Sequence, residues 1–278
     1  MKKNLIKSPL NYVGGKFKLL GDILPLFPEK VNTFADLFCG GANVGVNVSC
    51  NNVIFNDNES HVVALLEHLQ TTDVNELLTT IDNLIDTYNL SKTNAEGYNA
   101  LRDFYNQDTS NPMVFYTLVC YAFNNQIRYN KAGQFNMPFG KDRSSFNPTL
   151  RKKFVDFVEA LHNKDCTFSN EDFRDFDFSS LGQDDFVYAD PPYFNSVAAY
   201  NENGGWTAEH EKALLSILDG LDSRNIKFAL SNNLKYDNPI LKEWMEKYKV
   251  HYLNADYSNC NYHKKDKSPD VEVLITNY

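Results

Sequence analysis

The sequence lacks both the long apolar run of a membrane protein and the paired cysteines of a secreted or zinc-binding one. None of its apolar stretches approaches the ~20 residues that a membrane-spanning helix needs. The basic start, MKKNLIKSPL, is not followed by the long apolar segment of a signal peptide. The five cysteines are odd in number and form no CxxC pair, and the six histidines are scattered. We therefore expect a cytoplasmic protein with reduced thiols, no membrane association and no bound metal.

Positive charge is also scarce, except in one segment. The 278-residue chain carries a formal net charge of −9, which argues against indiscriminate binding of polyanions. Residues 123–153 contain seven basic residues and one acidic residue, a local balance of +6. Such a stretch is either a solvated surface or a local basic face for nucleic acid. With 42% hydrophobic and 23% charged residues, the chain is otherwise globular and long enough for one or two domains.

Strand and helix patterns alternate along most of the chain. Apolar runs predict strands at 33–41, 52–57, 185–190, 226–233, 250–257 and 271–278. Helical patterns occupy 42–49, much of 61–106, 112–125, 151–163, 207–225 with Thr207 as N-cap, and 238–249. This alternation predicts an α/β protein with a mostly parallel sheet and helices on both faces. We interpret residues 60–165 as a second domain inserted into a ligand-binding domain of residues 1–59 and 166–278.

Three carboxylates stand where predicted strands end. Asp36 lies near the end of the first strand, Asp57 follows the second, and Asp190 ends the strand at 185–190. In an open α/β sheet, ligands bind outside the carboxyl ends of the strands. The glycine-rich turn DLFCGGANVG lets backbone approach a ligand closely, but it is not a P-loop. Asp57, about 20 residues further on, suits a ribose diol, so the ligand is expected to be a dinucleotide or S-adenosylmethionine.

The tetrapeptide Asp190-Pro191-Pro192-Tyr193 distinguishes between these two ligands. Proline fixes φ at about −65° and has no N–H. The Asp190 carboxylate and the Pro191 carbonyl are therefore acceptors without a competing donor. Two convergent acceptors beside the Tyr193 ring suit a planar group that carries an NH₂, such as adenine. Hydrogen bonds from both N–H groups would aim the lone pair of the amine at a sulfonium methyl. A base inside a duplex is out of reach, so it must be flipped out.

These motifs together resemble the DNA adenine N6-methyltransferases of the Dam family, particularly the T-even phage and streptococcal types. The matching segments are LNYVGGKFKLL at 10–20, DLFCGG at 36–41, FND at 55–57, EDF at 171–173 and DPPY at 190–193. The resemblance covers nearly the whole chain and implies a Rossmann-like methyltransferase fold with S-adenosylmethionine as cofactor. It implies that residues 1–59 and 166–278 form the cofactor-binding catalytic domain and that residues 60–165 form the DNA target-recognition domain. It implies that the catalytic residues are Asp190, Pro191, Pro192 and Tyr193. The cofactor-binding residues that it implies are Tyr12, Lys16, Asp36, Phe38, Gly40, Asp57, Asp172, Phe173, Asp190 and Tyr200.

The inserted segment contains QIRYNKAGQFNMPFGKDR at 126–143, whose alternation around a central Ala-Gly predicts a β-hairpin or an extended loop. By the same resemblance, this hairpin enters double-stranded DNA beside the target, and Arg102 reads a flanking guanine, the commonest arginine–base contact. The DNA-binding residues so implied are Arg102, Asn124, Gln126, Arg128, Asn130, Lys141 and Arg143. Further basic residues at 131–153 are expected to contact phosphates. We expect the protein to act on DNA as a monomer or a weak dimer.

The resemblance implies GATC as the target, because relatives of this shape usually methylate adenine there. Two departures leave a different adenine-containing site open: Gln126 stands where relatives often carry an apolar residue, and Asp142 lies between Lys141 and Arg143. Amino-methylation of RNA, cytosine N4 or a glutamine side chain is an alternative, against which the aspartate before Pro-Pro-Tyr argues. A DNA-binding module without catalysis is another, against which the intact Asp190, Lys16 and Asp57 argue.

Overall fold

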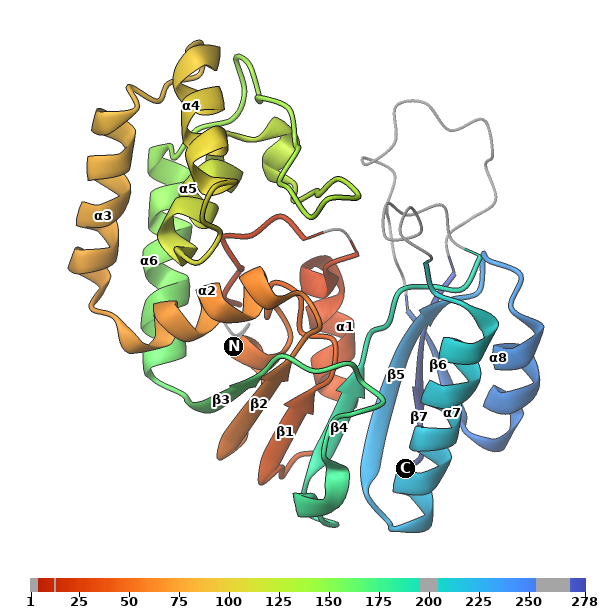
Figure 1. The fold of residues 1–278 in the computed structure, drawn as a ribbon. Coiled ribbons are helices and arrows are strands. Elements are labelled where there is room, and N and C mark those ends of the chain that lie inside the picture. Colours follow the sequence, from red (N-terminus) through yellow and green to blue (C-terminus); the bar gives the residue numbers. More distant parts are fainter. Residues whose placement is uncertain (1–4, 13, 196–204, 254–270) are drawn as a thin grey trace. The chain divides into compact units, whose positions relative to one another are not determined.

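The computed structural model describes residues 5–12, 14–195, 205–253 and 271–278 (Figure 1). Its contacts divide the chain into two compact units. The helical unit comprises Met1–Gly15, Gly40–Asn47 and Glu59–Asn170, and the sheet unit comprises Lys16–Cys39, Val48–Asn58 and Glu171–Tyr278. This division differs from the sequence-based domains because residues 1–15 and 40–47 group with the helical unit. The assignment of target recognition to residues 60–165 stays a prediction.

Seven strands form one sheet in the order β3-β2-β1-β4-β5-β7-β6. β1 (Thr33–Asp36) pairs in parallel with β2 (Asn52–Asn56) and with β4 (Phe186–Ala189), and β4 pairs in parallel with β5 (Lys227–Asn233). β7 (Glu272–Thr276) lies between β5 and β6 (Lys249–Leu253) and is antiparallel to both. The predicted α/β fold with a mostly parallel sheet is therefore confirmed.

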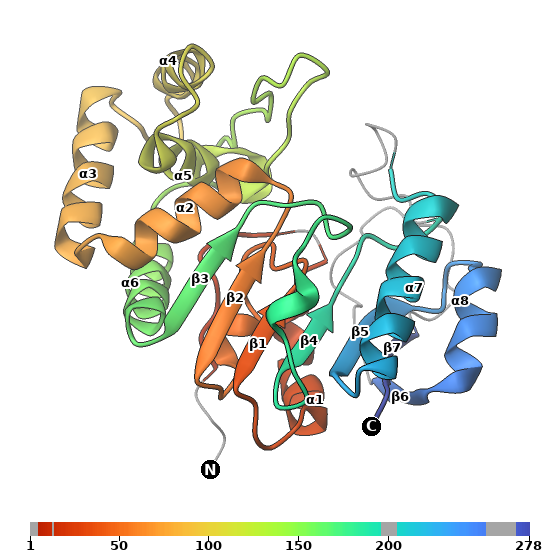
Figure 2. The same cartoon turned by 60° about the horizontal axis from the view of Figure 1, so that its bottom comes forward.

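Strands β1, β4, β5 and β7 are buried on both faces, because nearly all of their residues are buried and successive side chains point to opposite faces. One face packs with α7 (Ala208–Ser223) and α8 (Pro239–Trp244) and includes Ala35, Val187, Phe228 and Ile275. The other face carries a cluster of aromatic rings from Phe27, Phe34, Phe186 and Tyr188. The short helix α1 (Leu20–Ile23) precedes this cluster in the chain, and Figure 2 shows α7 lying beside β5 and α8 lying beside α7. With both faces covered, the ends of the strands are the places left for a ligand.

Five helices build the helical unit: α2 (Ser60–Thr71), α3 (Val74–Thr87), α4 (Ala95–Tyr105), α5 (Pro112–Tyr121) and α6 (Pro148–His162). Every residue of α5 from Met113 to Tyr121 is buried, and α2, α3 and α4 all pack against this helix. Side chains of Asp73, Asn94, Asn111 and Asn147 accept hydrogen bonds from the first turns of α3, α4, α5 and α6. The side-chain caps thus fix where α3 to α6 begin, and the buried helix α5 provides the core against which the other helices pack.

Three elements differ from the sequence-based expectation. The helix expected at 42–49 is only a 3-10 turn over Gly45–Asn47, because Ala42 adopts φ 60° and interrupts a helix there. The helix expected at 112–125 ends at Tyr121, since Ala122 is extended and Asn124 and Asn125 have positive φ. The edge strand β3 (Asp165–Ser169) is not predicted, because none of its five residues is fully buried and the apolar signal is weak.

The segment 126–143 folds back on itself without forming a regular two-stranded ladder. Its antiparallel pairing is limited to isolated bridges between Tyr129 and Phe135 and between Ala122 and Phe139. The reversal lies at 130–133, where the Gly133 N–H donates to the Asn130 carbonyl and Gly133 adopts φ +75°. The expected hairpin is therefore an extended loop with a tight reversal. In the ranges that the structure describes, no helix has the length and apolarity needed to cross a membrane.

Candidate active site

The strand order places a ligand site at the ends of β1 and β4. β1 is central, the chain moves outward from it to β2, and β4 then pairs with the other side of β1. Neighbouring parallel strands whose connections leave in opposite directions open a crevice at their carboxyl ends. Asp36 ends β1 and is 1% exposed, and Asp190 directly follows β4. Two of the predicted carboxylates therefore lie at the same edge of the sheet.

Asp190 forms an ion pair with Lys16, a residue that lies 174 positions earlier in the chain. The Lys16 Nζ is 2.7 Å from Oδ1 and 2.8 Å from Oδ2, so the ammonium is shared between both carboxylate oxygens. The Lys16 side chain is 2% exposed and that of Asp190 is 16% exposed. Burial raises the pKa of Asp190 above its ordinary value, although Lys16 and Tyr193 both oppose this rise. The result is a carboxylate whose direction is fixed and which keeps some exposure at the end of β4.

Tyr193 connects Asp190 to a second buried carboxylate that the sequence analysis missed. The Tyr193 Oη lies 3.4 Å from Asp190 Oδ1 and donates at 3.1 Å to Oε2 of Glu272, at the start of β7. The other oxygen of Glu272 accepts from the Asn233 Nδ2 at 2.9 Å. Glu272 is 4% exposed, and burial raises its pKa. A single glutamate at the head of the apolar run VLIT was the only sequence signal for this residue.

Asp57 and Asp36 form the acidic side of the same sheet edge. Asp57 directly follows β2 and is 8% exposed. Burial raises the pKa of the Cys39 thiol, and the negative charges of Asp57 and then Asp36 add to this rise, so both carboxylates lie near that thiol. The Cys39 N–H donates to the Asn56 carbonyl at 2.8 Å, which fixes the turn after β1 against the end of β2. Buried carboxylates at these two strand ends fit the hydroxyl groups of a ribose.

Aromatic rings form an apolar wall within the sheet unit. The Phe173 ring lies 5.4 Å from that of Phe38 and 5.2 Å from that of Trp206, measured between centroids. The Asn56 side chain fastens the segment before Phe173 by exchanging hydrogen bonds with the backbone of Glu171. Phe38 and Phe173 were predicted, whereas Trp206 was not, because it belongs to no strand end or motif. Such a wall fits the flat face of an adenine ring.

Four other predicted cofactor residues behave differently. Asp172 is held by Arg174 through contacts of 2.6 and 2.9 Å, which lower the pKa of the carboxyl. In the helical unit, the ring of Tyr12 packs on the backbone of Gly40, where an added Cβ would lie 2.9 Å from the ring. Gly40 also has φ +47°, so both space and backbone favour glycine. Tyr200 lies outside the described residues. No cluster of His, Cys, Asp or Glu suited to a metal occurs within the described ranges.

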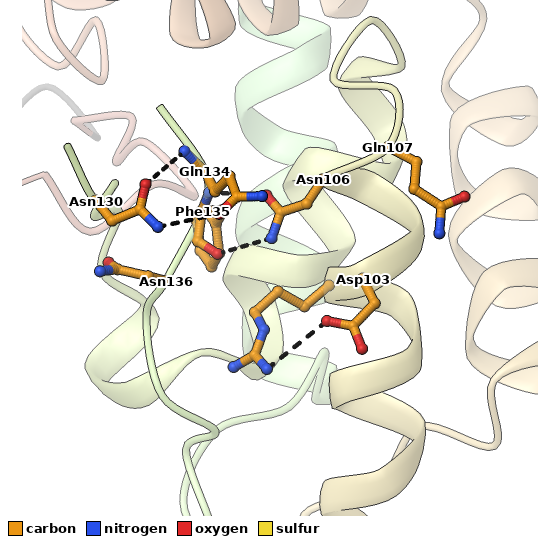
Figure 3. Close-up of a pocket in the computed structure, with 8 residues that line it drawn as sticks. Asp103, Asn106, Gln107, Asn130, Gln134, Phe135 and Asn136 are labelled. Carbon is orange, nitrogen blue, oxygen red and sulfur yellow. Dashed lines mark hydrogen bonds and ion pairs between the residues drawn. The ribbon is translucent and has the colours of Figure 1, made fainter. Parts of the chain in front are cut away.

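The loop at 126–143 and helix α4 form one structure within the helical unit (Figure 3). Asn106, which caps the end of α4, accepts from the Phe135 N–H at 2.8 Å and donates to the Phe135 carbonyl at 3.0 Å. The Tyr98 hydroxyl of α4 donates to the Met137 carbonyl at 2.7 Å. An open pocket of about 510 Å³ lies between them, lined by Arg102, Asp103, Asn106, Gln107, Asn130, Gln134, Phe135 and Asn136. Polar side chains line nearly all of this pocket.

The predicted DNA-binding residues of this unit differ in their exposure and in their hydrogen bonds. Arg102 lies on α4 with 28% of its side chain exposed, 3.8 Å from Asp103. Arg128 is exposed and donates twice to Asn136 at 2.8 Å, which fixes the direction of its guanidinium. Asn130 uses its side chain to hold the reversal, because its Oδ1 accepts from the Ala132 and Gln134 N–H groups. Asn124, Lys141 and Arg143 are exposed, and Gln126 is half-buried.

Part of the basic segment is neutralised within the protein. Arg151 makes two contacts with Asp82, at 2.7 and 2.8 Å, and Lys152 lies 2.7 Å from Asp156. These residues on α6 were counted with the basic face, but they already have carboxylate partners. The positive charge left for a nucleic acid is therefore concentrated on the loop, where Arg128, Lys131, Lys141 and Arg143 are exposed.

Comparisons with known proteins identify the family of the chain. Residues 12–259 match a family model described as D12 class N6 adenine-specific DNA methyltransferase. The chain is 49% identical to the type II methyltransferase M.FokI of Planomicrobium okeanokoites, covering 98% of this chain and 43% of that protein. It is 42% identical to the modification methylase StsI of Streptococcus sanguinis, covering 99% and 43%. It is 30% identical to the DNA adenine methylase of Escherichia coli K12, covering 92% and 89%. The chain thus spans less than half of the first two relatives.

Proposed function

Because the chain belongs to the D12 class N6 adenine-specific DNA methyltransferases, we propose that it transfers a methyl group to N6 of adenine in double-stranded DNA. The observation that carries this proposal is the Asp190 carboxylate, held by Lys16 at the end of β4 and followed by Pro-Pro-Tyr. The family implies S-adenosylmethionine as the methyl donor. Asp36, Asp57, Phe38 and Phe173 supply the carboxylates and the apolar wall that its ribose and adenine need.

The residues of the sheet unit perform three tasks in this reaction. Asp190 and the Pro191 carbonyl accept hydrogen bonds from the two N–H groups of the adenine amine, and the Tyr193 ring packs on the base. Lys16 holds the carboxylate in a fixed direction, so orientation is set before the base arrives. S-adenosylmethionine supplies the methyl group when it is bound. Because burial raises the pKa of Asp190, this carboxylate also accepts more readily the proton that the methylated amine releases.

The helical unit is proposed to select the target sequence. Hydrogen bonds from Asn106 and Tyr98 join the loop at 126–143 to α4, the helix that carries Arg102, so base-reading side chains keep their relative positions on binding. We propose that the target adenine is flipped out of the duplex, since a stacked base is inaccessible to Asp190. GATC is the first sequence to test, and Gln126 and Asp142 are the side chains that would account for a different site.

The function is tested by mapping modified bases in DNA from a methylation-deficient bacterial host that expresses this chain. N6-methyladenine at one recurring sequence, absent when the host expresses the Asp190→Asn variant, is the expected result. If that sequence is GATC, the proposed target is also correct. Methylation at a different adenine-containing sequence would indicate that the loop at 126–143 alters the target specificity. No modified adenine would overturn the proposed function and direct attention to RNA or to binding without catalysis.

Asp57→Asn is expected to weaken the binding of S-adenosylmethionine by about 10- to 100-fold, because a buried carboxylate contributes roughly 1.5–3 kcal/mol through hydrogen bonds to hydroxyl groups. Isothermal titration calorimetry measures this change without DNA. The matched control is Asp185→Asn, which alters another buried aspartate at the opposite end of β4, where it accepts from the Thr33 and Gly182 N–H groups. Equal dissociation constants for wild type and Asp57→Asn would contradict the ribose assignment.

Arg102→Ala is expected to relax the preference for one base beside the target adenine by about 1–3 kcal/mol. The reason is that a guanidinium reads guanine through two hydrogen bonds that no other base offers in the same geometry. Competition binding with a set of single-base substituted duplexes measures the preference. Lys131→Ala is the control. Lys131 is exposed at the tip of the loop, so its removal should weaken the binding of all duplexes equally. An Arg102→Ala variant that also weakens all duplexes equally would show that Arg102 contacts only phosphate.

A further inference from the structure

We propose that Glu272 is a positioning residue for methyl transfer, which keeps the Tyr193 hydroxyl from occupying the Asp190 carboxylate. The inference rests on the proposed function and adds a residue from β7 to it. Glu272 does not touch the base in this account. It acts by accepting the hydrogen bond of the Tyr193 hydroxyl, which would otherwise be donated to Asp190.

The geometry gives the Tyr193 hydroxyl two carboxylate acceptors. Its oxygen is 3.1 Å from Glu272 Oε2 and 3.4 Å from Asp190 Oδ1. A phenolic hydroxyl has one proton to donate, and the shorter contact is to Glu272. If the proton were directed to Asp190, it would occupy a lone pair that the adenine amine must use. Glu272 therefore leaves the acceptor capacity of Asp190 to the substrate.

The position of Glu272 is itself fixed. Its second oxygen accepts from the Asn233 Nδ2 at 2.9 Å, and its side chain is buried at the start of β7. β5, which carries Asn233, pairs with β7 so that Asn233 lies directly opposite Glu272. The Lys16 Nζ lies 5.1 Å from the centre of the Tyr193 ring, and this cation–π contact also holds the ring in place. Tyr193 is thus held at both its ring and its hydroxyl before a base arrives.

Glu272→Gln reverses the direction of the hydrogen bond while preserving the volume of the side chain. Asn233 can only donate at this position, so the glutamine is expected to turn its oxygen to Asn233 and its NH₂ to Tyr193. The NH₂ then donates to the Tyr193 oxygen, and the hydroxyl proton turns to Asp190. We expect kcat for methylation to fall about tenfold, while KM for DNA changes less than about twofold.

The test is a double-mutant cycle with Tyr193→Phe, which removes the hydroxyl and keeps the ring. In the Tyr193→Phe background, Glu272→Gln should lower kcat by less than about twofold, because no hydroxyl proton remains to be redirected. Glu211→Gln is the matched control, since Glu211 is also buried and also accepts from an asparagine, Asn238. Whatever Glu211→Gln does to kcat, the change should be the same in both backgrounds.

The outcomes separate this inference from the proposed function. An equal loss for Glu272→Gln in both backgrounds would show a purely structural role, and no loss in either would also overturn the proposal. The ¹³C resonance of the Tyr193 ring carbon that bears the hydroxyl gives a readout without turnover, and we expect it to shift in Glu272→Gln. If that resonance shifts but the wild type methylates no DNA, the proposed function fails and the positioning role in catalysis fails with it. An unshifted resonance would contradict the hydrogen bond to Glu272.

Discussion

Asp190→Asn is expected to lower the rate of adenine methylation on the order of 10²- to 10³-fold, the loss seen when one preorganised polar group is removed from a reaction centre. An asparagine presents an NH₂ where the carboxylate presents two acceptors. If this NH₂ faces the adenine amine, donor meets donor. If it faces Lys16 instead, the ammonium loses one of its contacts at 2.7 and 2.8 Å. Either orientation removes an interaction that the wild type has, and single-turnover methylation of a duplex measures the loss.

The same substitution is expected to cost stability, which must be separated from the chemistry. Lys16 is 2% exposed, and removing the partner of a buried ion costs about 3–5 kcal/mol. Urea unfolding measures this loss. The double variant Lys16→Met with Asp190→Asn removes both charges and is expected to recover most of the stability. A double variant that is folded and still inactive would assign the loss to chemistry, whereas Asp190→Asn with wild-type turnover would refute the catalytic role of Asp190.

Lys16→Met is expected to make methylation strongly dependent on pH. Lys16 lowers the pKa of Asp190 and burial raises it, so without Lys16 the pKa of Asp190 rises further. The carboxylate is the active form, and it is lost as the pH falls through this raised pKa. Activity should therefore decline as the pH is lowered, and the decline should begin at a higher pH than in the wild type. Methylation rates measured as a function of pH give the result, with Lys16→Arg as the control that keeps the charge.

Stability of Lys16→Met should vary with pH in the opposite direction. A carboxyl whose pKa is raised by folding contributes stability below its unfolded pKa, and this contribution is lost as the pH rises through the folded pKa. Relative to the wild type, Lys16→Met should therefore unfold at a lower urea concentration as the pH is raised. A midpoint difference that is the same at every pH would show that Lys16 does not control the charge of Asp190.

The sequence predicts those parts of the site that depend on local order along the chain. Asp36, Asp57 and Asp190 follow apolar runs, so their places at strand ends could be read from hydrophobic patterns. The expected strands at β1, β2, β4, β5, β6 and β7 exist for the same reason. The Lys16–Asp190 pair has no pattern of its own, since it joins segments 174 residues apart. Only the resemblance to a known family placed Lys16 near the site before its contacts were known.

The remaining features depend on pairing across the fold. Glu272 and Asn233 are brought together because β7 returns between β5 and β6, an order that alternation of elements does not specify. The loop at 126–143 has a hairpin pattern, yet it forms only isolated bridges because Asn106 and Tyr98 of α4 bond its returning segment. Arg151 reads as basic surface, but its partner Asp82 becomes visible only when α3 and α6 are packed, whereas Lys152 and Asp156 are four residues apart on α6 and their pairing follows from helical spacing.

The place of β7 inside the sheet has a consequence for how the protein is made. Tyr193 is 79 residues from Glu272, and Lys16 is 174 residues from Asp190, so the reaction centre closes two long loops. A chain still emerging from the ribosome already contains Asp190-Pro-Pro-Tyr but lacks the Glu272 acceptor of the Tyr193 hydroxyl until residue 272 has been synthesised. The helices around α5 form from nearer segments and can fold earlier. During synthesis, the part proposed to recognise DNA is therefore completed before the part proposed to modify it.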